Sequence, residues 1–189
     1  MPVDVAAVMA GLNLQRLDAP AERPYGERLA LWPTLTINGL HGGYGGPGSK
    51  TVLPSEAVAK CDIRLVEAQS ADDIYAKLQA HVARHAPEVE LIWQGAMDPS
   101  KTPMDSPFAA PLLAGIAQAQ GEAPLMLPAM GGSLPEYVWT KTLGVHAFVV
   151  PYANADEANH APNENIVVER FYAGVRTAAA LLAELAEPV

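Results

Sequence analysis

The sequence predicts two parts of different class, an α+β sheet domain followed by part of an α/β layer. Strand-like and helix-like patterns follow one another between residues 34 and 94. A turn-rich stretch, GAMDPSKTPMDSP, lies at 95–107 and predicts a domain boundary. A continuous apolar run and a long amphipathic segment then occupy the second half of the chain. Strands with helices in this order are typical of layered α/β architectures.

The first part opens with a predicted short helix at 3–12. Residues 18–33 are rich in proline, alanine and charge, and a loop is expected there. Leu35 and Ile37 alternate with polar neighbours, which predicts a half-buried strand. Six glycines and a proline fall within the thirteen residues 39–51, so no regular element is expected in that stretch.

Residues 57–66 carry the clearest strand pattern, because apolar and polar side chains alternate strictly along them. A helix is predicted to begin at Ser70, which fits a capping box with Asp73. Residues 88–94 predict a further strand. The polar face of the 57–66 strand holds three charged side chains: Lys60, Asp62 and Arg64.

The second part contains two predicted helices around one predicted strand. Ser106 and Pro107 are suited to the start of the first helix. Residues 143–150 are continuously apolar, which is typical of a strand covered on both faces. The last helix is predicted to bury an apolar stripe at helical spacing: Phe171, Val175, Ala178, Leu182 and Leu185.

The bulk composition excludes several classes of partner. The net charge of −9 opposes binding to nucleic acid, because an acidic chain repels phosphate groups. No apolar stretch is long enough to cross a membrane, so no membrane partner is expected. The single cysteine, Cys61, excludes an internal disulfide and agrees with a cytoplasmic location.

The acidic segment NADEANHAPNEN at 154–165 is the first candidate site. It follows the predicted buried strand, and such strand ends are where α/β sheets bind ligands. Imidazole and carboxylate both suit zinc. The alternative is a solvated acidic loop with Asn165 as a helix N-cap, and spacing alone favours that alternative. The segment places four candidate ligands within nine residues: Asp156, Glu157, His160 and Glu164.

The segment MGGSLPEY at 130–137 is the second candidate. Gly131 and Gly132 permit a close approach of backbone, and a helix beginning at Ser133 would offer free N–H groups to an anion. The structural alternative is a capping box between Ser133 and Glu136. Both interpretations are compatible with each other.

The third candidate combines the glycine-rich loop, with His41 and Thr51, and the strand residue Arg64. A guanidinium can grip a substrate carboxylate with two parallel hydrogen bonds. A surface arginine paired with Asp62 is the alternative, and without further information it is favoured. The remaining histidines are interpreted as structural or surface residues: His81, His85 and His146.

These stretches, taken together and in order, resemble the M20 family of zinc hydrolases. The similarity is strongest to its dipeptidase and carnosinase-like branch, and it covers essentially the whole chain. The resemblance implies a partial ferredoxin-like lid sheet, the dimerisation domain, at 1–95. It implies the C-terminal part of an α/β phosphorylase/hydrolase-like zinc peptidase domain at 105–189. The stretches that carry it are 40–66, 130–139 and 154–165.

The resemblance also implies roles for individual residues. His160 in HAPNE matches the family's last metal ligand, in an enzyme that holds two zinc ions. Arg64 in IRLV matches the arginine that binds the substrate's carboxylate. Thr51 matches a threonine that contacts substrate across the dimer, and Gly132 and Ser133 match the family's G-G-S segment.

Other family motifs have no counterpart here: the H-x-D motif, the general-base Glu-Glu pair and the D-L-H-S-G segment. Ala129 and Met130 stand where the dipeptidase branch commonly has arginine and glutamate. We therefore expect a C-terminal portion of a dizinc hydrolase, inactive alone and without bound zinc. The full enzyme would cleave peptide or N-acyl amide bonds of small substrates with a free carboxylate.

The expected partners are a second copy or a larger self-assembly and, in the full enzyme, a small peptide or N-acyl amino acid. One alternative is a non-catalytic dimerisation or binding module that uses the lid sheet as its interface. Another is the product of a degenerate reading frame that folds only by self-association.

Overall fold

The computed structural model describes residues 3–17 and 22–186. The chain forms two compact units. The first consists of Met1–Ser100 together with Ala129–Val138, and the second of Lys101–Pro128 together with Trp139–Val189. Helices and one two-stranded antiparallel sheet make up a mixed α/β fold, as the sequence predicts.

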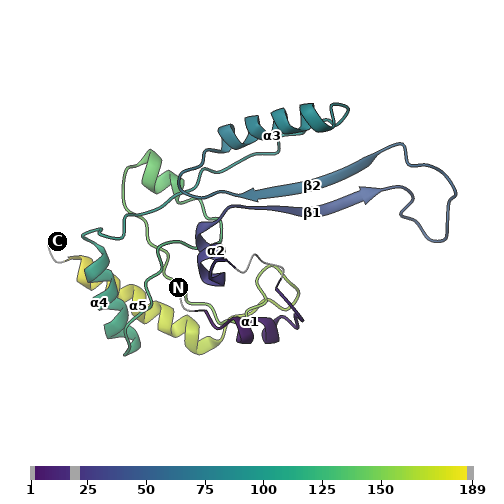
Figure 1. The fold of residues 1–189 in the computed structure, drawn as a ribbon. Helices are drawn as coiled ribbons and strands as arrows, with labels where there is room; N and C mark the ends of the chain where they lie inside the picture. The colour runs from purple at the N-terminus through teal and green to yellow at the C-terminus, as the bar shows by residue number, and fades with distance from the viewer. Residues whose placement is uncertain (1–2, 18–21, 187–189) are drawn as a thin grey trace. The chain divides into compact units, whose positions relative to one another are not determined.

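A long hairpin of β1 (Thr34–Gly42) and β2 (Ala57–Arg64) forms the sheet of the first unit (Figure 1). Thr34 pairs with Arg64 at one end of the ladder, and Gly42 pairs with Ala57 at the other. Both predicted strands are confirmed. The prediction of no regular element at 39–51 is wrong for residues 39–42, because β1 continues through them on the partner supplied by β2.

Two short helices precede the hairpin, α1 (Val5–Gly11) and α2 (Tyr25–Leu31). The first agrees with the predicted helix at 3–12. The second corrects the predicted loop at 18–33, of which residues 18–21 lie outside the described chain. Pro24 stands just before the first turn of α2, where its fixed φ favours helix entry rather than breaking the helix.

Helix α3 (Ala71–His85) confirms the helix predicted after Ser70. The predicted capping box is wrong, because the Ser70 side chain makes no capping hydrogen bond. A residue distant in sequence takes that role instead: the carboxylate of Asp98 accepts the backbone N–H of Ala71 at 3.2 Å. One face of α3 is half-buried through Ile74, Leu78 and Val82.

The strand predicted at 88–94 is not formed among the described residues. This segment lies against α3 instead. The rings of Tyr75 and Trp93 are 4.4 Å apart between centroids, and the Tyr75 hydroxyl donates to the Leu91 carbonyl at 3.5 Å. A strand exists only where a second backbone completes its ladder, and the described part of the chain provides none here.

The second unit contains α4 (Ala109–Gln120) and α5 (Val168–Ala186), which pack against each other (Figure 1). The buried positions on these helices carry small side chains, namely Gly115 on α4 and Gly174 and Thr177 on α5. Small residues let helix backbones approach closely. A π-helical turn, η1 (Val138–Thr142), lies between α4 and α5 in the chain.

The predicted burial of the α5 apolar stripe is wrong. Within the described chain Phe171 is 56 % exposed and Leu182 is 73 % exposed. The buried residues of α5 are Gly174 and Thr177, and the part of α5 at Ala180, Leu181 and Glu184 lies against Gly115 of α4. The other members of the predicted stripe are exposed as well: Val175, Ala178 and Leu185.

The buried strand predicted at 143–150 is also wrong, because no ladder forms there among residues 3–17 and 22–186. Side chains hold this segment instead. The Thr102 hydroxyl donates to the Ala147 carbonyl at 2.7 Å and accepts the Ala147 N–H at 3.0 Å. The Ser106 hydroxyl lies 2.6 Å from Nδ1 of His146, which agrees with a structural role for that histidine.

No hydrophobic side chain of the described residues is buried from solvent. Apolar side chains on the hairpin, the connecting segments and α5 are therefore open to solvent. Within the same residues, no helix is both long enough and apolar enough to span a lipid bilayer.

Candidate functional site

Arg64 ends β2 on its polar face and is the centre of the candidate site. Its Nη1 donates to the hydroxyl oxygen of Ser133 at 2.5 Å. Its Nε lies 3.3 Å from Oδ2 of Asp62. A guanidinium carries five N–H donors, so three remain without an acceptor among the described residues. The pair with Asp62 and a grip on a carboxylate are therefore compatible.

Ser133 reaches Arg64 because the segment 129–138 folds back onto the first unit. Its predicted capping box with Glu136 is wrong. The turn that follows is the π-helical η1, which begins only at Val138, and the Ser133 hydroxyl serves Arg64 instead. The hydrogen bond between Arg64 and Ser133 joins residues 69 positions apart.

Gly131 explains how this segment comes so close to the rest of the unit. A Cβ at position 131 would lie 2.6 Å from the backbone carbonyl oxygen of Leu29 in α2. No real Cβ tolerates that distance to a backbone atom. The predicted close backbone approach therefore occurs at Gly131, and it brings Gly132 and Ser133 to the end of β2.

Thr51 is not brought to Arg64. It lies exposed in the loop that joins β1 to β2. That loop connects Gly42 to Ala57, whereas Arg64 pairs with Thr34 at the opposite end of the ladder. Within one chain, the structure thus unites Arg64 and Ser133 and leaves Thr51 at the far end of the hairpin.

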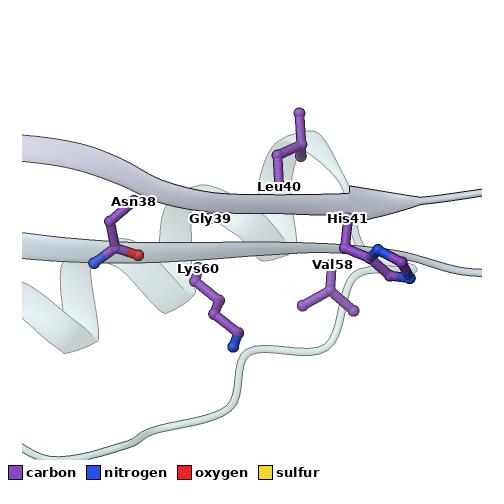
Figure 2. Close-up of a pocket in the computed structure, with 6 residues that line it drawn as sticks. All are labelled: Asn38, Gly39, Leu40, His41, Val58 and Lys60. Atoms are coloured by element: carbon purple, nitrogen blue, oxygen red, sulfur yellow. The ribbon is translucent and has the colours of Figure 1, made fainter. Parts of the chain in front are cut away.

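A shallow hollow lies on one face of the hairpin, near its loop end. Figure 2 shows Asn38, Lys60 and Val58 directed to one side of the strands and Leu40 directed to the other. The residues that line it are Asn38, Gly39, Leu40, His41, Val58 and Lys60. The ammonium group of Lys60 adds a positive charge on the same polar face that carries Asp62 and Arg64.

His160 lies in the second unit, in the exposed loop that precedes α5. Its backbone is left-handed, with φ of 60°. The predicted N-cap role of Asn165 is wrong, because α5 begins only at Val168. The Asn165 amide instead donates to the carbonyl of Asn163 at 3.0 Å and so holds the loop.

Asn154 organises the same loop from its other end. Its amide nitrogen donates to Asp156 Oδ1 at 2.7 Å, and its amide oxygen accepts the Val167 N–H at 3.0 Å. The hydrogen bond from Asn154 lowers the pKa of Asp156, and a backbone hydrogen bond adds to that shift. The loop is therefore shaped by amide side chains.

The four candidate ligands of this loop do not converge. Among residues 3–17 and 22–186, no three histidine, cysteine, aspartate or glutamate side chains come together as a metal site. His160 is thus a single imidazole in an exposed loop of this chain.

Two contributors were not predicted from the sequence as site residues. The Asn38 amide donates to Asp62 Oδ1 at 3.1 Å, so Asp62 is held from β1 while it faces Arg64. Asn38 lies at the register irregularity between Ile37 and Gly39. The polar alternation of β2 signals Asp62, but nothing in the sequence signals the register irregularity at Asn38.

Comparison with known proteins identifies the family of the region that carries the hairpin. Residues 7–90 match the M20 family model described as the peptidase dimerisation domain. This region contains the whole hairpin, with Asp62 and Arg64, and all of α3. Residues 7–90 therefore belong to the class of M20 peptidase dimerisation domains.

Curated relatives match most of the chain. The Cys-Gly metallodipeptidase DUG1 of Candida albicans is 30 % identical over 158 residues, which cover 77 % of this chain and 31 % of that protein. Its Saccharomyces cerevisiae counterpart is 28 % identical and is covered to 33 %. The chain belongs to the M20 peptidase family and spans about a third of the length of these relatives.

Solved structures carry the same fold. An M20 family metallo-carboxypeptidase from Sulfolobus solfataricus, Sso-CP2, matches with a TM-score of 0.86 and 26 % identity, over 96 % of this chain and 42 % of that one. Human carnosine dipeptidase 1 matches with a TM-score of 0.80 and 21 % identity, over 98 % of this chain and 40 % of that one. At 21 % identity, the match to the human protein shows a shared fold only.

Proposed function

We propose that this chain provides the carboxylate-binding part of an M20-type hydrolase that cleaves peptide or N-acyl amide bonds of small, dipeptide-like substrates. In this proposal residues 1–95 belong to the lid, or dimerisation, domain and residues 105–189 to the C-terminal part of the catalytic domain. The match of residues 7–90 to the dimerisation domain supports the first assignment. A cytoplasmic location belongs to the same proposal.

The contact between Arg64 and Ser133 carries the proposal. It holds an arginine at an exposed strand end with several N–H donors still unused. Charge-assisted hydrogen bonds from a planar guanidinium suit a carboxylate better than any neutral group. Gly132 and Ser133 would border the bound carboxylate. Thr51, at the far end of the hairpin, would contact a substrate held by a second copy.

The metal part of the proposal concerns His160, which lies apart from Arg64 and Ser133 in the sequence. His160 would be one ligand to a pair of zinc ions, which lower the pKa of bound water in such enzymes. Zinc usually takes four ligands, and the described residues do not assemble such a set. Within residues 3–17 and 22–186 the side chains therefore do not fit a zinc centre, and we propose that the chain alone is inactive.

A non-catalytic dimerisation or binding module is the second candidate. The observation that favours it is the match of residues 7–90 to a peptidase dimerisation domain, in a chain where the candidate metal ligands do not converge. Such a module would associate with a second copy and bind carboxylates without hydrolysing them.

The proposal is tested by carboxylate binding to the chain itself. N-acetylglycine and its uncharged analogue N-acetylglycinamide are titrated into 15N-labelled protein, and backbone shifts are followed by NMR. Arg64→Ala should weaken binding of the acid by about tenfold, because that ratio corresponds to the free energy of one hydrogen bond to a charged group. Binding of the amide should hardly change.

Arg84→Ala is the matched control, because Arg84 is an exposed arginine on α3. It removes the same charge without touching the site. If Arg64→Ala and Arg84→Ala weakened binding of the acid equally, the effect would come from the change in net charge, and this result would contradict the proposal. Arg64→Lys, which keeps the charge but loses the planar fork, should bind the acid less well than the wild type.

A further inference from the structure

Asp62 lies between two side chains and uses both of its carboxylate oxygens. Oδ1 accepts a hydrogen bond from the Asn38 amide at 3.1 Å, and Oδ2 lies 3.3 Å from Nε of Arg64. Asp62 pairs with Thr36 across the sheet, not with Asn38. Its contact with Asn38 is therefore diagonal across the sheet and lies beside the register irregularity between Ile37 and Gly39.

The two contacts of Arg64 lie at different nitrogens of one rigid plane. Asp62 faces Nε, and Ser133 binds Nη1. A single contact would leave the guanidinium free to rotate about that contact. Two contacts from residues on separate segments determine the direction of the plane, and they direct the unused N–H groups toward one region of space.

We propose that Asp62, held in place by Asn38, is a positioning residue that orients Arg64 for a substrate carboxylate. This inference rests on the proposed function of Arg64. Asp62 itself does not touch the substrate. Its negative charge, 3.3 Å from Arg64, repels a bound anion. Orientation and charge therefore predict opposite results when the carboxylate is removed, and this difference makes the inference testable.

The experiment compares N-acetylglycine binding by the wild type, Asp62→Ala, Asp62→Asn and Asn38→Ala. Asp62→Ala should weaken binding of N-acetylglycine by up to about fivefold, which corresponds to the free energy of a partly exposed ion pair. This loss is expected although the substitution removes a negative charge that repels the ligand. Asp62→Asn keeps an acceptor oxygen and should retain more affinity than Asp62→Ala. Asn38→Ala removes only the support of Asp62, and a smaller loss in the same direction is expected.

Asp72→Ala is the charge-matched control, since Asp72 is an exposed carboxylate in the first turn of α3. It should leave binding of N-acetylglycine unchanged or slightly stronger. A second readout is the Arg64 side chain itself, followed through its Nε–H signal and the rotation rate of its guanidinium by NMR. Rotation should be slow in the wild type and faster in Asp62→Ala and Asn38→Ala, while the backbone signals of β1 and β2 persist.

Two results would overturn the inference. One is equal or tighter N-acetylglycine binding by Asp62→Ala, which would mean that charge outweighs orientation. The other is unchanged guanidinium rotation in Asp62→Ala. If Arg64→Ala does not weaken binding of the acid, the proposed function fails instead. The rotation measurement distinguishes the two failures, because it reports on the support of Arg64 without any ligand.

Discussion

At the scale of single residues, Thr177 illustrates a polar group enclosed by a close helix contact. Its side chain is 0 % exposed, on the face of α5 that packs against α4. Its hydroxyl has no hydrogen-bond partner within the described chain. A buried hydroxyl that lacks a partner loses its interactions with water and regains nothing.

We therefore expect Thr177→Val to stabilise the protein. Valine keeps the branched shape and has a similar helix propensity, while the unpaired hydroxyl is removed. The free energy of unfolding should rise by about 1 kcal/mol. Denaturant unfolding measures this, with Thr177→Ser as the control that keeps the hydroxyl but loses the methyl group. A less stable valine variant would mean that the hydroxyl is satisfied in solution.

Asn154 gives a second prediction at this scale. Its hydrogen bond is the largest cause of the lowered pKa of Asp156. Asn154→Ala should move that pKa back toward its ordinary value, as measured by NMR titration of the carboxyl carbon. Asn159→Ala, elsewhere in the same exposed loop, should leave the pKa unchanged.

The sign of the pH effect follows from the direction of this shift. Because the folded state lowers the pKa of Asp156, the contribution to loop stability is complete above the ordinary aspartate value. It is lost as the pH falls through the lowered folded value. The contribution of Asp156 to the loop that carries His160 should therefore be lost only under acid conditions. Its loss at neutral pH would contradict this account.

At the scale of elements, the contact of α5 with its neighbours depends on the absence of side chains. A Cβ at Gly174 would lie 2.9 Å from Cγ of Tyr152, which belongs to the same unit. The Tyr152 ring therefore reaches α5 at a glycine, and α5 reaches α4 at Gly115, where an added Cβ would lie 3.3 Å from Leu181. The exposed bulky side chains of α5, among them Phe171, Val175 and Leu182, lie away from these contacts.

Gly174→Ala should consequently destabilise the protein, although alanine is the better helix former by about 1 kcal/mol. Melting temperatures measured by circular dichroism test this. Gly11→Ala in α1 is the control, because nothing lies within 4 Å of a Cβ built there. The control should be neutral or slightly stabilising. A stabilising effect at Gly174 would show that Tyr152 can move away without loss.

At the scale of the whole molecule, the apolar surface predicts self-association. Among the described residues no hydrophobic side chain is buried, and solvent-exposed apolar side chains occur on the hairpin and on α5. Monomeric proteins seldom leave large apolar patches in contact with water. A match to a dimerisation domain points the same way.

We expect size-exclusion chromatography with light scattering to find no stable monomer at micromolar concentration, despite the net charge of −9. Leu182→Glu should shift the assembly toward smaller species if the exposed face of α5 takes part. Leu53→Glu is the matched test of the apolar surface on the hairpin, because Leu53 lies in the hairpin loop and is 91 % exposed. A compact wild-type monomer would contradict the expectation.

The second whole-molecule prediction concerns metal and activity. We expect no stoichiometric zinc by elemental analysis and no hydrolysis of dipeptides by this chain alone, because only His160 matches the ligand set that the family resemblance implies. Tightly held zinc that disappears in His160→Ala would overturn this view. Activity that persists in His160→Ala would indicate a contaminating enzyme.

The sequence by itself determined the elements whose signal is local. Strict alternation identified β2 and placed Asp62 and Arg64 on one face, because successive side chains of a strand point to opposite sides. Helical spacing located α3 and α5 within a few residues of their observed ends. Three ordered motifs were enough to indicate the family.

Only the tertiary structure decided the features that need a partner from elsewhere. Residues 88–94 and 143–150 have strand composition but no ladder in the described chain, because a strand is completed by a second backbone. Which face of α5 is buried depends on what approaches it, and periodicity alone favoured the wrong face. The contact of Arg64 with Ser133 spans 69 residues, and it depends on folding that no local pattern encodes.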